Sequence, residues 1–229
     1  MLAIISDVHG NLPALKSVLK KIKKLGCKKI ISLGDITGYY SESNKCINLL
    51  KSLNANQLMG NHDMYLVDQS IPPKSKLIRF LLEHQIKSVS KDNIKFLKSL
   101  KSYFTEDNMS FVHGGWRDNL NEYLYEIEEK NLVGDYKFFF SGHTHVQKII
   151  KFKKKTYCNP GSVGQPRDGN PKAAFATIEN NKIYLHRVKY DIEKTILSMN
   201  EAGFVDKKYY ENLYSGTQIG GGLFSIKAT

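Results

Sequence analysis

Side chains that commonly bind metal ions recur along this sequence, each shortly after an apolar segment. In chain order they are Asp7 and His9, Asp35, Asn61 and His62, His113, and His143 with His145. Carboxylate, amide and imidazole groups are typical ligands of divalent transition metals. A single histidine in a loop is more often a hydrogen-bonded structural group than a ligand. The joint occurrence of these residues is what predicts a metal site.

The apolar segments before these side chains predict strands that deliver them to one place. We expect strands at residues 2–5, 29–33, 56–59, 109–112 and 137–140. Helical periodicity of apolar residues separates the first three, over about 12–25 and 44–53. Alternating strands and helices predict a parallel sheet, and such sheets form their sites at the carboxyl ends of the strands. The candidate ligands are therefore expected to converge.

The rest of the chain is expected to be helical first and β-rich later. Helices are predicted over about 74–100, 117–130 and 192–202, and hairpins over 101–112, 147–158 and 173–188. We see no internal repeat and no linker, so we expect one domain over residues 1–229. The tail from about 204 to 229 is expected to pack on the core or on a neighbouring molecule.

Composition narrows the class of protein. The 229-residue chain is 41% hydrophobic and has no apolar run of 18 residues, so we expect no membrane span. Its first residues lack the basic region and cleavage site of a signal peptide. The three cysteines are scattered and form no C-x-x-C motif, which argues against a disulfide scaffold. Together these features predict a cytoplasmic protein.

The formal net charge of +12 leaves two interpretations open. Strong positive charge is typical of proteins that bind nucleic acid, and it also attracts phosphate substrates of any size. Lysines supply most of this charge, and many of them lie on the expected solvent side of the helix at 12–25, where lysines are common. The charge therefore indicates an anionic partner without choosing between a nucleic acid and a small phosphate ester.

The candidate ligands form blocks that resemble the signature of the calcineurin-like metallophosphoesterase superfamily. The blocks are Asp7-x-His9, Gly34-Asp35, Gly60-Asn61-His62-Asp63, His113 after an apolar strand, and Gly142-His143-x-His145. The segment 159–167 is similar to the one that follows the last ligands in small prokaryotic phosphodiesterases of that superfamily. The resemblance implies an α/β fold of two facing mixed β-sheets flanked by helices, a four-layer sandwich with the site at one edge.

The resemblance also implies a role for each block. It implies two divalent transition-metal ions bridged by Asp35, with manganese expected and iron, nickel or zinc as alternatives. The other ligands fall into two sets: Asp7, His9 and His145 for the first ion, and Asn61, His113 and His143 for the second. His62 would bind no metal and would act on the substrate as general acid or electrostatic stabiliser. Asp63 would either hydrogen-bond to His62 or shape the loop, and the sequence leaves both roles open.

One departure from the superfamily bears on the substrate. Its serine/threonine protein phosphatases carry an Asp-Arg pair shortly after the Gly-Asp block, whereas here Ile36 to Tyr40 follows without that pair. We therefore expect hydrolysis of phosphodiester bonds in small or nucleotide-type substrates, with a metal-activated water as nucleophile. The candidate substrate contacts are Asn11, Tyr39 and Arg167. Two of them have structural alternatives, because Asn11 suits a helix cap and Arg167 suits an exposed turn.

Two further functions compete with this prediction. A nuclease is motivated by the net charge, although nucleases of the superfamily usually add a domain to grip DNA and this chain has no room for one. A non-catalytic interaction module on the same fold, similar to the retromer subunit, is the second alternative. Such relatives lose site residues, whereas His62 and every candidate ligand are present here. The oligomeric state is not predicted.

Overall fold

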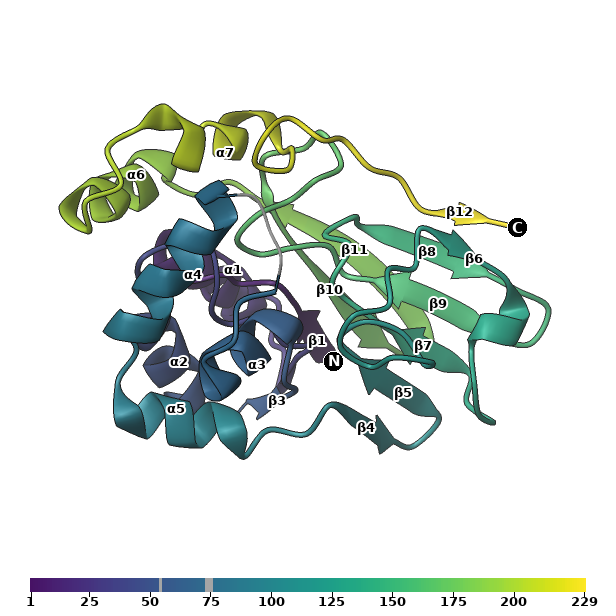
Figure 1. Ribbon diagram of the computed structural model, residues 1–229. Helices are drawn as coiled ribbons and strands as arrows, with labels where there is room; N and C mark the ends of the chain where they lie inside the picture. Colours follow the sequence, from purple (N-terminus) through teal and green to yellow (C-terminus); the bar gives the residue numbers. More distant parts are fainter. Residues whose placement is uncertain (54, 73–75) are drawn as a thin grey trace.

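Two five-stranded mixed β-sheets form the centre of the computed structural model, which describes residues 1–53, 55–72 and 76–229 (Figure 1). The first sheet has the strand order β11 (Lys182–Val188), β10 (Ala173–Glu179), β1 (Leu2–Ile5), β2 (Lys29–Ser32) and β3 (Asn56–Gln57). Strand β1 pairs in parallel with β2, and β2 pairs in parallel with β3. On its other side β1 pairs antiparallel with β10, so the late hairpin extends the early parallel sheet.

The second sheet has the strand order β4 (Tyr103–Glu106), β5 (Met109–Val112), β7 (Phe138–Phe140), β9 (Thr156–Asn159) and β8 (Lys148–Lys151). Its three central strands run parallel, and each outer strand pairs antiparallel with its neighbour. The predicted hairpins over 101–112 and 147–158 are the two edges of this sheet.

Apolar side chains from both sheets fill the space between them. Ile4 and Ile31 of the first sheet belong to the same buried cluster as Phe111 and Phe140 of the second. The rings of Phe111 and Phe140 stack with centroids 5.1 Å apart. Burial of each such side chain stabilises the fold by roughly 1.5–3 kcal/mol. This shared core holds the sheets face to face and so fixes the strand ends of one sheet relative to those of the other.

Helices cover the outer face of the first sheet (Figure 1). Val18 and Ile22 of α1 (Leu12–Lys24) pack in one cluster with Ala3 of β1 and Ile47 of α2 (Ser43–Ser52). The remaining helices are α3 (Asn61–Asp68), α4 (Lys76–Ser88), α5 (Lys91–Lys98), α6 (Ile192–Glu201) and α7 (Asn212–Ser215). The predicted fold class is confirmed. Among the described residues, no helix is long and apolar enough to cross a membrane.

The helical region predicted over 74–100 forms two helices. Ser90 accepts a hydrogen bond from the backbone N–H of Asn93 and caps α5 two residues after α4 ends. Residues 74 and 75 lie outside the described residues. Helix α3 was not predicted, because its buried residues include three polar ones at its start, Asn61, His62 and Asp63, and these give no apolar stripe.

The helix predicted over 117–130 is wrong. The structure has turns there, followed by β6 (Glu126–Ile127) and the short 3-10 helix η1 (Glu129–Asn131). Asp118 Oδ1 accepts hydrogen bonds from the backbone N–H groups of Leu120 and Asn121, each 3.0 Å long. Side chains that satisfy nearby backbone donors in this way compete with helix formation.

The C-terminal tail lies along its own chain. Its last strand, β12 (Lys227–Ala228), pairs in parallel with β6. Ile226 is 2% exposed and packs in the cluster that includes Phe139 and Tyr157 of the second sheet. Within a single chain, the tail therefore packs against the second sheet (Figure 1).

Candidate metal centre

The loops that carry the candidate ligands have an unusual backbone. Five of the ligands have φ angles in the left-handed region: Asp7 (54°), His9 (52°), Asp35 (52°), His143 (63°) and His145 (60°). Residues other than glycine adopt such angles rarely, at a cost of order 1–3 kcal/mol each, and they do so mainly at functional sites. The strained backbone therefore indicates that these five residues are held in orientations that a function requires.

Glycines allow neighbouring loops to approach these ligands closely. A Cβ atom on Gly60 would lie 2.1 Å from Asp35 Oδ1, and one on Gly38 would lie 2.4 Å from His9 Nδ1. Both distances are far below van der Waals contact, so only glycine fits at either position.

Four of the predicted ligands form a first cluster. Ligand atoms of Asp7, His9, Asp35 and His145 lie within 4.8 Å of one another. The Nε2 atoms of His9 and His145 are 3.0 Å apart, and His145 Nε2 is 3.2 Å from Asp7 Oδ1. His9 Nε2 is 3.7 Å from Asp35 Oδ2. The structure thus brings together the whole set predicted for the first ion.

A second cluster shares Asp35 with the first. Ligand atoms of Asp35, His113 and His143 lie within 4.8 Å of one another. His113 Nε2 is 3.4 Å from Asp35 Oδ2 and 3.0 Å from Asn61 Oδ1, which adds the amide to the group. Because Asp35 Oδ2 faces imidazoles of both clusters, the geometry suits a carboxylate that bridges two cations.

Three of the four imidazoles are oriented by backbone carbonyls. The Nδ1 atoms lie at hydrogen-bond distance from carbonyl oxygens: His9 from Thr37 (2.9 Å), His113 from Leu33 (3.0 Å) and His145 from Gln165 (2.6 Å). A carbonyl oxygen only accepts, so each Nδ1 carries the proton and each Nε2 of a neutral ring keeps its lone pair. This arrangement is typical of metal-binding histidines.

Two buried polar atoms support the same conclusion. His143 Nε2 is buried and makes no hydrogen bond to any described residue, and buried Asp7 Oδ1 has as its near neighbour His145 Nε2 at 3.2 Å, a nitrogen whose lone pair faces it when that ring is neutral. Leaving such an atom unpaired costs about 1–3 kcal/mol, and a cation within the clusters would satisfy both. The donor set of carboxylate, imidazole and amide without thiolate is one that manganese, iron, nickel and zinc accept. The residues present therefore fit a two-metal centre.

The electrostatic environment keeps the two carboxylates ionised, as the binding of a cation requires. Burial acts to raise the pKa of Asp35, but His113 and His62 outweigh it and hold that pKa well below its usual range. His145 does the same for the pKa of Asp7. Burial acts to lower the pKa of His113, whereas the Asp35 carboxylate raises it, to about 9. Ionised carboxylates are the form that binds a cation.

His62 lies beside the clusters and belongs to neither of those found in the described chain. Its backbone N–H donates a 2.8 Å hydrogen bond to Asp35 Oδ1. Its ring centroid is 4.9 Å from that of His9 and 4.7 Å from that of Tyr39. This position next to the ligands is compatible with the predicted role as a proton donor.

Asp63 joins two of the ligand-bearing loops. Its carboxylate accepts hydrogen bonds from the backbone N–H of Gly60 (3.1 Å) and from both the N–H (3.0 Å) and the hydroxyl (2.8 Å) of Thr37. Burial, with the nearby charge of Asp35, raises the pKa of Asp63 to about 6. Of the two roles left open by the sequence, these contacts support that of shaping the loop.

Arg167 and Tyr39 form one wall of the site. Arg167 is 3% exposed, so it is not a surface turn residue. Its Nη2 donates to Tyr39 Oη (3.1 Å), and Nε and Nη2 donate to Gln165 Oε1 (3.1 and 2.8 Å). These partners are neutral, so the guanidinium charge is buried without a carboxylate bonded to it. Because the Tyr39 ring is 4.6 Å from that of His9, this positive charge lies close to the candidate ligands.

Asn11 is occupied by contacts within the fold. Its Oδ1 accepts hydrogen bonds from the backbone N–H of Ala14 (3.2 Å) at the start of α1 and from the hydroxyl of Thr195 (2.9 Å). Its Nδ2 donates to the carbonyl of Gly164 (2.9 Å). These bonds match the capping alternative, and we do not include Asn11 among the proposed substrate contacts.

Two tyrosines beside the site were missed by the sequence analysis. Tyr65 Oη accepts a 3.1 Å hydrogen bond from Asn61 Nδ2, one turn along α3, and that spacing would have been a signal had the helix been predicted. The Tyr123 ring lies 3.8 Å from that of His143. No local sequence pattern placed Tyr123 at the site, because it belongs to the segment for which a helix was wrongly predicted.

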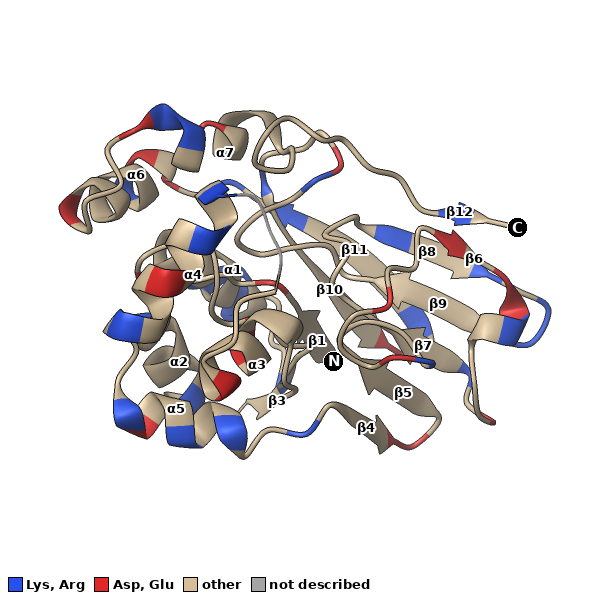
Figure 2. Ribbon diagram, in the orientation of Figure 1, with Lys and Arg blue, Asp and Glu red and all other residues tan. Residues whose placement is uncertain are grey.

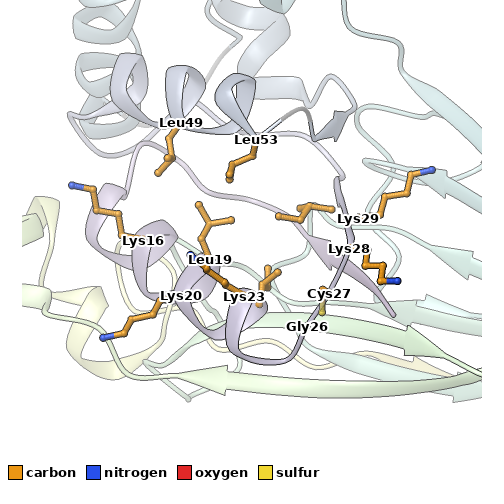
Figure 3. Close-up of a pocket in the computed structure, with 12 residues that line it drawn as sticks. Lys16, Leu19, Lys20, Lys23, Gly26, Cys27, Lys28, Lys29, Leu49 and Leu53 are labelled. Carbon is orange, nitrogen blue, oxygen red and sulfur yellow. The ribbon is translucent and has the colours of Figure 1, made fainter.

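A separate hollow of about 740 Å³ lies between α1, α2 and β2, away from the clusters (Figure 3). Leu19, Leu49 and Leu53 point toward its centre, while Lys16 and Lys20 extend outward at the rim. The residues that line it include no carboxylate and no imidazole. This hollow therefore lacks the ligands that a metal centre needs.

Comparison with a protein family agrees with the geometry. Residues 1–181 match the family described as the calcineurin-like phosphoesterase superfamily domain. The matched range contains every residue of the two clusters, together with His62, Tyr39 and Arg167.

Individual relatives extend the match over most of the chain. An uncharacterized protein of Methanocaldococcus jannaschii is 36% identical over 219 residues, which cover 85% of this chain and 89% of the relative. The crystal structure of a metallophosphoesterase from Sphaerobacter thermophilus aligns with a TM-score of 0.83 at 30% identity, covering 94% of this chain and 98% of that one. A hypothetical protein from Pyrococcus horikoshii OT3 aligns with a TM-score of 0.82 at 20% identity, over 94% and 99%, and shares the fold.

Proposed function

The chain belongs to the calcineurin-like phosphoesterase superfamily, and on that premise we propose that it hydrolyses phosphodiester bonds with two divalent metal ions. Membership of the family, with the buried Asp and His clusters, supports a phosphoric ester hydrolase that binds divalent metal. The observation that carries the finer proposal is that both ligand clusters share Asp35. Manganese is the metal we would add first, with iron, nickel and zinc as the alternatives.

Each residue of the site has a part in this proposal. When bound, the cations would activate a water molecule as nucleophile and neutralise charge on the phosphate. His62, beside the bridging Asp35, gives a proton to the leaving oxygen. Arg167 grips a phosphate oxygen through its guanidinium fork, and Tyr39 holds that fork in place.

A small or nucleotide-type diester is the proposed substrate class. A diester carries one negative charge, which the buried Arg167 would compensate once the cations hold the rest of the phosphate. The Asp-Arg pair of the protein phosphatases is missing after Asp35. The missing pair favours a diester over a phosphoprotein, whereas the guanidinium would bind the phosphate of either one.

The two rival functions are less well supported. On the face shown in Figure 2, Lys and Arg are dispersed over α4, α5, β8 and β12, with Asp and Glu between them, so the described part of this face has no single track for a nucleic acid. Lysines do gather around the hollow between α1, α2 and β2, which shares no residue with the ligand clusters. A non-catalytic interaction module would not need a complete ligand set, yet all seven predicted ligands converge here.

The test is the hydrolysis of an aryl phosphodiester and of the matching monoester, each with added Mn²⁺ and with chelator. We expect turnover that depends on Mn²⁺ and is faster for the diester. Faster turnover of the monoester would replace the phosphodiesterase with a phosphatase. If neither ester is hydrolysed by protein shown to hold two metal ions, the interaction module becomes the better hypothesis.

A further inference from the structure

His143 differs from the other imidazoles of the centre in what holds its ring. The other three rings each have a backbone carbonyl next to Nδ1. Nε2 of His143 is buried and makes no hydrogen bond to any part of the chain that the structure describes, although its backbone N–H donates to Asp7 Oδ2 (3.1 Å). Two rings lie against it: Tyr123, with centroids 3.8 Å apart and planes 31° apart, and His113, edge-on with centroids 5.0 Å apart.

Tyr123 is itself the second of four aromatic rings that lie in a row. Tyr125 stacks on it at 5.6 Å with planes 7° apart, and Phe224 of the C-terminal tail stacks on Tyr125 at 5.1 Å with planes 18° apart. We call His143, Tyr123, Tyr125 and Phe224 the aromatic row. It runs from a ligand of the second cluster to a segment about 80 residues later in the chain.

The tail end of the aromatic row is fixed by backbone hydrogen bonds. The N–H of Phe224 donates to the carbonyl of Arg167 (2.9 Å), and the N–H of Lys227 donates to the carbonyl of Tyr125 (2.9 Å). Beyond them β12 pairs with β6, and Ile226 is buried. The tail is therefore hydrogen-bonded both to the loop that carries the tyrosines and to the loop that carries Arg167.

The stacking shows what Tyr123 does in the site. Tyr123 is 46% exposed, and an exposed tyrosine beside a phosphoesterase centre invites the idea of a platform for a substrate base. Its ring already contacts two neighbouring rings, however, those of His143 and Tyr125. Because these contacts join the ring to a candidate ligand on one side and to the row that reaches the tail on the other, it is better suited to holding His143 than to binding substrate.

We propose that Tyr123 is a positioning residue for His143 and that the C-terminal tail, through Phe224 and Tyr125, holds Tyr123 in place. The aromatic row replaces the carbonyl that orients each of the other imidazoles. This inference rests on the proposed function, because it concerns the second of the two metal sites. It predicts that damage to the row weakens the second metal ion and spares the first.

The test is the titration of purified, metal-free protein with Mn²⁺, followed by calorimetry and by electron paramagnetic resonance. The variants are Tyr123→Ala, Tyr123→Phe and Phe224→Ala. Tyr103→Ala removes a tyrosine that is 58% exposed on β4, and Leu223→Ala removes a tail side chain that is 64% exposed, so these are the matched controls.

Tyr123→Ala and Phe224→Ala are expected to weaken the second Mn²⁺ by about tenfold, the lower end of what loss of an orienting group costs, with the first unchanged. At equal added Mn²⁺, both should show more isolated-ion signal and less spin-coupled-pair signal than wild type. Tyr123→Phe keeps the ring and should bind as wild type does.

Three results would overturn the inference. One is wild-type affinity for the second ion in both Tyr123→Ala and Phe224→Ala. Another is an equal weakening of both ions together with a lower melting temperature, which would mean that the aromatic row only stabilises the fold. A wild-type protein that binds fewer than two Mn²⁺ would refute the two-metal centre of the proposed function and, with it, this inference.

Discussion

Arg167 offers the sharpest test of how substrate is bound. The change is Arg167→Met, which keeps much of the side-chain length and removes the charge. A hydrogen bond to a charged group contributes about 1.5–3 kcal/mol. Loss of one such bond to phosphate should therefore lower kcat/KM for the aryl diester by about 10- to 150-fold, since about 1.4 kcal/mol corresponds to a factor of ten.

Stability should respond differently from activity. The variant loses the bonds to Tyr39 and Gln165, and each partner atom left unpaired costs about 1–3 kcal/mol. Against this, the fold no longer has to bury a positive charge whose bonded partners are all neutral, which by itself is a cost of several kcal/mol. The two effects oppose each other, so we expect a melting temperature close to that of wild type.

The assay is steady-state hydrolysis of the aryl diester at saturating Mn²⁺, with thermal denaturation of the same samples. Arg79→Met is the control, because the Arg79 side chain is 65% exposed and pairs with Glu83 on the surface. A kcat/KM within twofold of wild type in Arg167→Met would refute phosphate binding by Arg167. A large loss of stability would show instead that the guanidinium is part of the fold.

Three other substitutions test the centre itself. His62→Ala should keep both metal ions and the fold while losing about 10²-fold or more in turnover of the diester, as expected for loss of a general acid; unchanged turnover would remove His62 from the mechanism. Asp35→Asn should lower metal content measured by elemental analysis, because it halves the carboxylate charge of the first cluster, and full occupancy would contradict the bridge. Gly38→Ala places a Cβ 2.4 Å from His9 Nδ1 at a φ of +139°, so it should destabilise the protein by more than about 1 kcal/mol and weaken Mn²⁺ binding. A Gly38→Ala protein with the melting temperature and metal content of wild type would show that the loop can move aside.

The convergence of the candidate ligands could be predicted from the sequence because strand ends are readable from periodicity, whereas their division between two ions was implied by the family resemblance. Apolar segments that stop at Asp7, Asp35 and His113 place these residues at the carboxyl ends of strands, whatever the details of the loops. Asp63 could not be assigned in the same way, since its role depends on which backbone donors of a distant loop lie within reach. The backbone carbonyls that bond to the imidazoles could not be predicted from the sequence either, because every residue type has a carbonyl.

The segment 117–130 shows the other limit of the sequence analysis. Its charged and apolar residues satisfy a helical pattern, yet turn contacts at Asp118 compete with the helix. Once the turns form, Tyr123 is carried to His143, and Phe224 joins it from the far end of the chain. A contact between segments so far apart in the sequence depends on the whole fold, and no local sequence pattern predicts it.

The carboxylates of two candidate ligands help to hold the strained centre together through hydrogen bonds to neighbouring loops. Asp7 uses Oδ2 to accept the backbone N–H of His143, while its Oδ1 faces His145. Asp35 uses Oδ1 to accept the backbone N–H of His62, while its Oδ2 faces imidazoles of both clusters. Each carboxylate thus binds the backbone of a neighbouring loop with one oxygen, which leaves the other oxygen for the proposed cation. Both residues have left-handed backbone angles, and we propose that this strain aligns the candidate ligands before any metal binds.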